Sequence, residues 1–177
     1  MAIERSRRRV AASRMATLAA ELLDGSLLCA IATVAPGSRA HVNTAYFAWN
    51  PDFEIVWMSD PNARHSRNLR ANRSVAIAVF ESAQTWGEPD RGIQLFGSAA
   101  LAEGSALERV ETLYASRFST VREHDLSAYS FYSFRPSRLK LFHELALGAG
   151  VFVTARVART GRLTWETTEV YRAGEDS

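Results

Sequence analysis

The sequence predicts a mainly β (α+β) fold, in which six to eight antiparallel strands close into a small barrel with flanking helices. Two observations lead to this prediction. Segments with the apolar patterning of strands follow one another through turns rather than through helices along most of the chain. A helical period interrupts them in three places, two long and one short. Closing such a sheet into a barrel removes its exposed edges.

The composition is that of an ordinary globular protein, because 47% of the 177 residues are apolar. A formal net charge of +2 is too small to indicate nucleic-acid binding. Nearly all basic residues are arginines, as in proteins from GC-rich bacterial genomes, and arginine gives planar bidentate contacts to anions. The sequence shows neither a signal peptide nor a run long enough to span a membrane, so we expect a cytoplasmic bacterial protein.

Cysteine and histidine chemistry is sparse. Cys29 is the only cysteine, so it can form no internal disulfide and no cysteine metal cluster. Its apolar neighbours in residues 27–32 predict a small buried side chain. The histidines are scattered without the paired spacing of metal ligands, and we expect no metal site. They are His41, His65, His124 and His143.

The beginning of the chain differs from the rest. Residues 1–24 predict an N-terminal basic arm and an amphipathic helix, and residues 25–177 predict a single domain. The arginines of the arm are Arg5, Arg7, Arg8, Arg9 and Arg14. We expect the arm to be a solvated tail. Ala11, Met15, Leu18 and Leu22 recur at helical spacing, and Gly25 marks the end of this helix.

Strand patterns follow along the chain. In the first half they cover residues 27–34, 41–49, 53–58 and 75–80. In the second half they cover residues 92–101, 129–134, 138–142, 151–157 and 163–171. Gly97 is expected to mark a bulge or a point of close approach. A helix is expected to begin at Ser105, whose side chain and that of Glu108 form a capping-box pattern.

Trp86 lies in a polar, turn-rich loop over residues 82–90. It is a candidate lid over a planar ligand. It could equally pack on its own subunit or on a dimer partner, because a tryptophan ring buries a large apolar area in any of these places.

Residues 59–72 contain the strongest functional signal. Asp60 can cap a helix and Pro61 suits its first turn, so a short helix is expected directly after the strand 53–58. Arg64 and His65 lie one turn in. Free backbone N–H groups, the positive end of the helix and guanidinium groups together favour a bound phosphate. The alternative is a solvated basic helix that joins two strands.

Six short motifs follow one another along the chain. They are Ala30-Ile31-Ala32-Thr33-Val34, His41-Val42-Asn43-Thr44, Trp57-Met58-Ser59, Arg64-His65, Asn68-Leu69-Arg70-Ala71-Asn72 and Gly92-Ile93-Gln94-Leu95-Phe96-Gly97. Their order and spacing over residues 27–103, and more loosely to 142, resemble the pyridoxamine 5'-phosphate oxidase-like superfamily. The resemblance implies a Greek-key-like split β-barrel that binds flavin mononucleotide (FMN) over residues 25–177. It also implies a homodimer with two FMN sites at the subunit interface.

The resemblance assigns a part of the flavin to each motif. Val42, Asn43, Thr44 and Ala45 would run beside the isoalloxazine ring. Met58 and Ser59 would meet the ring or the ribityl chain. Arg64 and His65 would hold the phosphate, and Gln94 would reach the site from the partner subunit.

The implied activity is that of an FMN-dependent oxidoreductase acting on a small organic substrate. No catalytic side chain is assigned, because flavin chemistry often needs none. The sequence departs from the vitamin B6 enzyme of this superfamily. Phe47 and Ala48 occupy the region of its substrate lysine, its C-terminal Arg-Leu-x-Pro ending is absent, and Tyr114 and Arg117 are one residue too close together to match its substrate tyrosine and arginine. We therefore expect a different oxidoreductase.

Three alternatives remain open from the sequence. One is a deazaflavin-dependent reductase of the same fold. Another is a non-catalytic flavin- or haem-binding module, and haem would require His41 or His143 to face a cavity. The third is a nucleic-acid-binding barrel that uses the N-terminal arginines, although the strands lack the interleaved aromatic and basic residues of such proteins.

Overall fold

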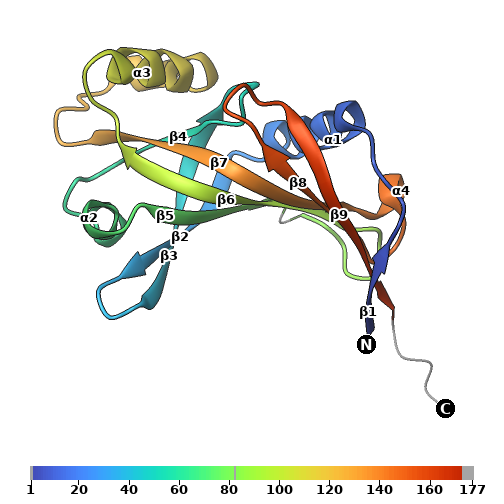
Figure 1. The fold of residues 1–177 in the computed structure, drawn as a ribbon. Coiled ribbons are helices and arrows are strands. Elements are labelled where there is room, and N and C mark those ends of the chain that lie inside the picture. Colours follow the sequence, from blue (N-terminus) through green and yellow to red (C-terminus); the bar gives the residue numbers. More distant parts are fainter. Residues whose placement is uncertain (1, 82, 173–177) are drawn as a thin grey trace.

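A computed structural model describes residues 2–81 and 83–172 of the chain (Figure 1). Its strands are β1 (Ala2–Ser6), β2 (Leu28–Ala35), β3 (Arg39–Trp49), β4 (Ile55–Ser59), β5 (Ser74–Phe80), β6 (Arg91–Leu101), β7 (Ser130–His143), β8 (Val151–Val157) and β9 (Leu163–Arg172). Its helices are α1 (Ala12–Asp24), α2 (Arg64–Ala71), α3 (Ser105–Arg117), the 3-10 helix η1 (Ser119–Glu123) and α4 (Glu144–Leu147).

Six of the strands close into a barrel. In the described part of the chain, one antiparallel nine-stranded sheet runs in the order β1-β9-β8-β7-β4-β3-β2-β5-β6, and β6 also pairs with β7. The second pairing of β7 closes strands β2 to β7 on themselves, while β8, β9 and β1 extend the sheet beyond the barrel. The structure thus confirms the mainly β, antiparallel class with flanking helices.

The strand β7 is longer than the sequence predicts. Residues 129–134 and 138–142 were expected to be separate strands, but β7 runs unbroken from Ser130 to His143. Pro136 falls at a bulge, where the pairing of β6 with β7 shifts register between Phe96 and Gly97. Because a bulge relieves the ladder at that point, proline is tolerated inside the strand. Gly97 marks the bulge, as predicted.

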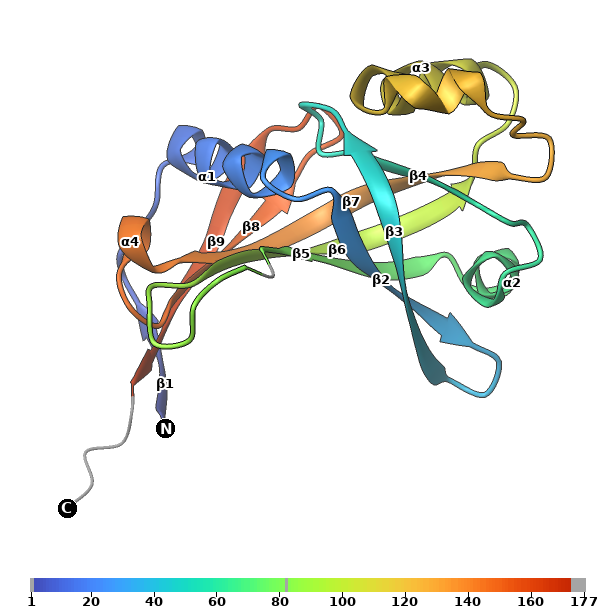
Figure 2. The same cartoon turned by 180° about the vertical axis from the view of Figure 1, so that it is seen from behind.

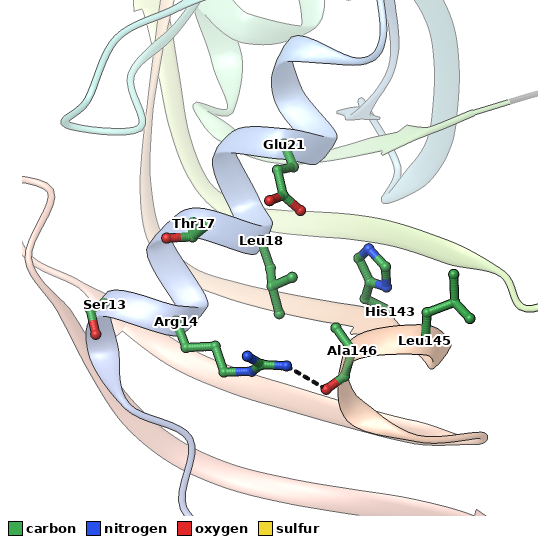
Figure 3. Close-up of a pocket in the computed structure, with 8 residues that line it drawn as sticks. All are labelled: Ser13, Arg14, Thr17, Leu18, Glu21, His143, Leu145 and Ala146. Atoms are coloured by element: carbon green, nitrogen blue, oxygen red, sulfur yellow. Dashed lines mark hydrogen bonds between the residues drawn. The ribbon is translucent and has the colours of Figure 1, made fainter.

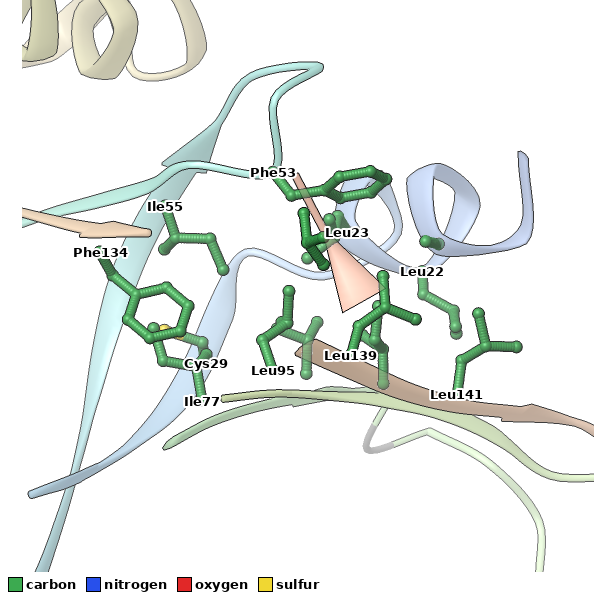
Figure 4. Packing of buried hydrophobic residues seen from close by; sticks show 14 of the residues in the cluster. Leu22, Leu23, Cys29, Phe53, Ile55, Ile77, Leu95, Phe134, Leu139 and Leu141 are labelled. Atoms are coloured by element: carbon green, nitrogen blue, oxygen red, sulfur yellow. The ribbon is translucent and has the colours of Figure 1, made fainter. Parts of the chain in front are cut away.

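The barrel is filled by inward-facing side chains of the strands and closed on one side by α1. The helix packs against β9, β6 and β5. Figure 4 shows Leu22 and Leu23 of α1 above Leu95, Leu139 and Leu141 of the strands. A second apolar cluster lies between α3 and strands β3, β4 and β7. The amphipathic helix predicted within residues 1–24 is confirmed as α1, with Gly25 at its C-cap.

The N-terminal arm is ordered. Residues 2–6 form β1 and pair in antiparallel register with β9, so that Ala2 lies opposite Arg172 (Figure 2). The Arg8 guanidinium donates to the Leu147 carbonyl at 2.8 Å, and Arg9 lies over the Trp165 ring. The expectation of a solvated tail is wrong for these residues, because the edge of β9 offers unpaired backbone groups that β1 satisfies.

Two helix starts differ from the capping predictions. α2 begins at Arg64 with Ala63 as N-cap, and Asp60 instead accepts the backbone N–H of Asn62 in a turn before the helix. α3 has Gly104 as N-cap, at φ 56°, and Ser105 is its first helical residue. The capping box therefore does not form. Before α2 a turn uses the residues that the sequence pattern assigned to the helix, whereas at α3 the helix begins one residue earlier than the pattern requires.

Cys29 is buried, and burial raises the pKa of its thiol to about 12, so it stays protonated at neutral pH. Within residues 2–81 and 83–172, no helix is both long and apolar enough to cross a membrane.

Candidate functional site

The start of α2 presents an unused cation and unused donors. Arg64, the first residue of α2, is exposed, and its guanidinium has no hydrogen bond or ion pair with any described residue. The first backbone bond of the helix runs from the Arg67 N–H to the Ala63 carbonyl, at 3.0 Å. The N–H groups of Arg64, His65 and Ser66 have no acceptor in residues 2–81 and 83–172. Together these donors form a potential anion site.

The other arginines of α2 are occupied. The Arg67 guanidinium donates to the Asn62 carbonyl at 2.6 Å, and the Arg70 guanidinium donates to the Pro61 carbonyl at 2.7 Å. Both side chains fold back onto the turn before the helix and stabilise it. Arg64 is thus distinguished from its neighbours by its chemistry as well as by the resemblance.

His65 points into the protein, away from Arg64. Its side chain is buried, and its ring lies edge-on to Tyr132 with 6.4 Å between centroids. Burial, reinforced by the charge of nearby His41, lowers the pKa of His65 below its usual 6.5. The ring is therefore neutral at neutral pH. Nε2 is buried without a hydrogen-bond partner among the described residues.

The β3 residues assigned to the flavin alternate between two faces. Val42 and Thr44 are exposed on the outer face of the sheet, while Asn43 and Ala45 lie half-buried on the other. Asn43 Oδ1 is buried and has no partner in the described structure. Unpaired buried acceptors and donors are uncommon in native proteins and are typical of sites that complete their hydrogen bonds with a ligand. Of the residues assigned to the flavin, Arg64 with the free N–H groups at the start of α2 fits a phosphorylated cofactor.

The outer face of the barrel contains an apolar cavity of about 330 Å³ lined by both Val42 and Gln94. In the sheet, Ala30 lies opposite Thr44 and Ala78, and Ala78 lies opposite Gln94. Small side chains at the centre of this face leave room for a flat group between Val42 and Gln94. Sequence reasoning placed Gln94 in the site of the partner subunit, and within one chain it shares a surface with Val42.

Met58 and Ser59 end β4, opposite Phe131 and Ser130 of β7. Met58 is half-buried and packs against the apolar cluster beneath α3. Ser59 is also half-buried, and the turn that leads to α2 follows it directly. Ser59 thus precedes the turn that carries the chain to the anion site, whereas Met58 contributes to the packing of α3.

Several residues that support the site were not singled out by their chemistry in the sequence. Asn68 of α2 donates to the Thr33 hydroxyl of β2 at 3.0 Å, and both side chains are buried. This bond fixes α2 to the barrel. Trp57 stacks on Tyr132 with 5.6 Å between centroids, and Tyr132 contacts His65 in turn. In the sequence, Asn68 was indicated only as part of the motif Asn68-Leu69-Arg70-Ala71-Asn72.

A second cavity, of about 500 Å³, lies between α1 and α4 (Figure 3). His143 lines it and is 8% exposed. Its Nδ1 is buried without a partner among the described residues. Arg14 and Glu21 of α1 lie along the same cavity, and the Arg14 guanidinium donates to the Ala146 carbonyl at 2.8 Å. His143 is one of the two histidines that the haem alternative names, and it lines this cavity.

The chain is similar to known proteins in sequence and in fold. A family model described as pyridoxamine 5'-phosphate oxidase matches residues 15–143. No curated protein sequence matches the chain significantly. A haem-binding protein from Mycobacterium smegmatis is 19% identical, with a TM-score of 0.68 over 88% of this chain and 62% of that chain. The chain therefore spans less than two thirds of that protein.

Two further solved structures share the fold. A putative pyridoxamine 5'-phosphate oxidase from Listeria innocua is 14% identical, with a TM-score of 0.58 over 72% of this chain and 98% of that chain. An F420 reductase is 21% identical, with a TM-score of 0.53 over 67% of this chain and 93% of that chain. Similar barrels thus occur in a protein described as haem-binding and in one described as an F420 reductase.

Proposed function

The chain belongs to the pyridoxamine 5'-phosphate oxidase family, and from this premise we propose that it is a homodimeric FMN-dependent oxidoreductase acting on a small organic molecule. The observation that carries the proposal is the free Arg64 guanidinium beside three unbonded N–H groups at the start of α2. A phosphate monoester satisfies all these donors at once. The other arginines of α2 are already bonded to backbone carbonyls.

The remaining residues of the site suit the other parts of FMN. Arg64 and the free N–H groups at the start of α2 would bind the phosphate, and neutral, inward-facing His65 would add no second charge there. Asn43 and the backbone of Val42 to Ala45 would meet the polar edge of the ring, and Ser59 would meet the ribityl chain. The bound flavin supplies hydride transfer, and the chain's residues hold it and exclude water.

The substrate differs from that of the vitamin B6 enzyme. Phe47 and Ala48, which stand where that enzyme has a substrate lysine, are both buried, Phe47 in the barrel and Ala48 in the cluster beneath α3. Arg117 is occupied by the backbone carbonyls of Leu23 and Ser26, at 2.9 and 2.7 Å. None of these side chains is free to bind a phosphorylated pyridine. We therefore expect an organic substrate without that phosphate group.

The proposal is tested by the absorption spectrum of the purified protein before and after titration with FMN. A bound flavin spectrum and a saturable change of flavin fluorescence are expected. Parallel titration with F420, the cofactor named for one structural neighbour, tests the deazaflavin alternative. Saturable binding of F420 with no binding of FMN would contradict the choice of FMN.

Haem binding is a second candidate function, favoured by His143. This imidazole is almost fully buried, lacks a partner for Nδ1 within the described residues, and lines a cavity of about 500 Å³. A sharp, intense violet band on addition of haem, lost in His143→Ala, would support this function. If His143→Ala leaves the band unchanged, the ligand is another residue and this cavity is not the haem site.

A further inference from the structure

The outer face of the barrel has small side chains at its centre and larger ones at both ends. The central row crosses the strands as Thr44, Ala30, Ala78 and Gln94. One end carries Val42 and Phe96, next to α2. The other carries Tyr46, Leu28 and Phe80, next to the connection between β5 and β6. These larger side chains are exposed in the single chain, and an exposed apolar patch of this kind is typical of a protein interface.

A two-fold axis that lies along the central row, in the plane of the face, would pack this face against itself. In a two-fold interface the same patch contributes from both subunits, and because this axis crosses the strands, the two ends of the face exchange places. The alanines let the sheets approach closely, and the Val42 and Phe96 end of one subunit meets the Tyr46 and Phe80 end of its partner. This dimer is the one that the proposed function requires.

The two ends of the face also have opposite charge. α2 and the residue pair that follows it carry Arg64, Arg67, Arg70 and Arg73, with no acidic residue from 61 to 80. At the other end, the loop over residues 83–90 carries Glu88 and Asp90, both exposed, and no basic residue. Exchange of the ends places this acidic loop beside the basic helix of the partner, and such complementarity favours one register of the dimer.

Trp86 is at the tip of this loop and is 99% exposed in the single chain. The base of the loop is fixed. The Gln84 amide accepts the Arg91 backbone N–H at 2.6 Å and donates to the Glu81 carbonyl at 2.9 Å. A rigid base holds the indole out in solvent, where a large apolar ring is unfavourable unless it has a surface to cover.

We propose that the loop 83–90 of each subunit lies over α2 of its partner and that Trp86 covers the partner's cofactor site beside Arg64. The proposal rests on the proposed homodimer and adds a residue from the second subunit to the site. The indole is a planar, apolar cover suited to a flavin ring, while Glu88 and Asp90 lie near the positive charge of the partner's α2.

The test is a cysteine cross-link between the loop and α2. Trp86→Cys is combined with Asn62→Cys, an exposed position next to the helix start, which leaves Arg64 intact. Within one chain α2 precedes the start of β5 and the loop follows its end (Figure 2), and the seven residues of β5 span about 23 Å. This distance far exceeds the Cα separation of a disulfide, which is at most about 7 Å. A disulfide between them must therefore join two subunits.

We expect mild oxidation to give a covalent dimer on a non-reducing gel. Trp86→Cys combined with Thr112→Cys, on the exposed side of α3, is the matched control and should stay uncrosslinked. A protein that is dimeric by light scattering but forms no 62–86 cross-link overturns the loop placement and leaves the FMN proposal intact. A monomeric protein overturns the loop placement together with the dimer.

A second measurement uses the cofactor. If the indole stacks on the flavin, Trp86→Ala raises the fluorescence of bound FMN toward that of free FMN, and Trp86→Phe restores part of the quenching. Unchanged fluorescence in Trp86→Ala, with FMN still bound, contradicts the placement of Trp86 on the ring. Loss of FMN binding in the wild-type protein would instead contradict the proposed function.

Discussion

At the scale of single residues, Arg64 is the most direct probe of the anion site. We expect Arg64→Ala to weaken FMN binding by about 1.5–3 kcal/mol, the contribution of a hydrogen bond to a charged group. This corresponds to a loss of affinity of roughly 10- to 150-fold. Fluorescence titration measures it. Arg67→Ala is the control, because Arg67 is bonded to the Asn62 carbonyl and should change affinity little. Equal losses in both variants would mean that α2 binds the phosphate only through its net charge.

His65 should make stability depend on pH. Its pKa is lowered in the folded protein by burial, so the unfolded state binds the proton more readily. The contribution of neutral His65 to the free energy of unfolding is therefore fully present above the unfolded pKa of about 6.5. It is lost as the pH falls below that value. We expect His65→Gln to reduce the loss of stability between pH 7 and pH 5, measured by urea unfolding at each pH. Parallel pH profiles for the two proteins would show that His65 is not the titrating group.

Glu54 is a buried charge with several partners. It is 1% exposed and is bonded by Arg109, Ser133, Arg135 and Asn50. Burial alone would raise its pKa, but the bonds from Arg109 and Ser133 and the nearby charge of Arg135 lower it below the usual 4.5.

We expect Glu54→Gln to cost about 1.5–3 kcal/mol of unfolding free energy at pH 7, because its hydrogen bonds become neutral. The difference from wild type should shrink as the pH falls below 4.5, where the unfolded carboxylate is protonated and the wild type loses the same stabilisation. Chemical denaturation at pH 7 and pH 3.5 checks both statements. A difference that is constant with pH would show that the charge of Glu54 contributes nothing.

At the scale of elements, the bulge between β6 and β7 depends on the absence of a side chain at Gly97. A Cβ at this position would lie 2.1 Å from the Arg135 carbonyl oxygen. We expect Gly97→Ala to destabilise the protein by about 3 kcal/mol, the upper part of the range for overpacking, because backbone must move. Ser98→Ala, at the next and exposed position, is the control and should be near neutral. Thermal unfolding distinguishes the two, and equal stabilities would mean that the bulge relaxes freely.

Most elements followed from local patterns, and the exceptions have physical causes. The strands β2 to β6, β8 and β9 and the helices α1 and α3 have periodic apolar residues, and all were expected within a few positions. β1 was missed because its residues Ala2 to Ser6 have no core face, so that no apolar period marks a strand that is held by pairing with β9. β7 was predicted as two strands because a proline normally ends a strand. Pro136 is tolerated here only because it lies at the bulge between β6 and β7.

The site was harder to predict than the fold. The alternation along residues 41–49 assigned Val42 and Thr44 to one face of the strand, as observed. It did not indicate which of the two faces would be exposed to solvent. The inward orientation of His65 also escaped prediction, since it depends on the Asn68–Thr33 hydrogen bond that sets the rotation of α2. From the sequence, Arg117 was interpreted as a substrate residue or a surface residue. In the structure its guanidinium instead donates to the carbonyls of Leu23 and Ser26, at the connection between α1 and β2.

At the scale of the whole molecule, the predicted homodimer should depend on the small central row of the outer face. Ala78 lies there, half-exposed, beside Ala30 and Gln94. We expect Ala78→Glu to give a monomer by light scattering, because two like charges would be buried close together on the two-fold axis. FMN affinity should fall with it. Thr112→Glu on α3 is the control, and a dimeric Ala78→Glu protein would exclude this face as the interface.

The pairing of β1 with β9 sets Ala2 directly opposite Arg172. Neighbouring ends on an antiparallel ladder can be linked by a tight hairpin connection, so the polypeptide can be re-joined there and opened elsewhere. The exposed turn after β2, at residues 36–38, is a suitable new opening. Such a circularly permuted chain would keep every barrel pairing and would leave the sheet extension of β8, β9 and β1 in the middle of the sequence.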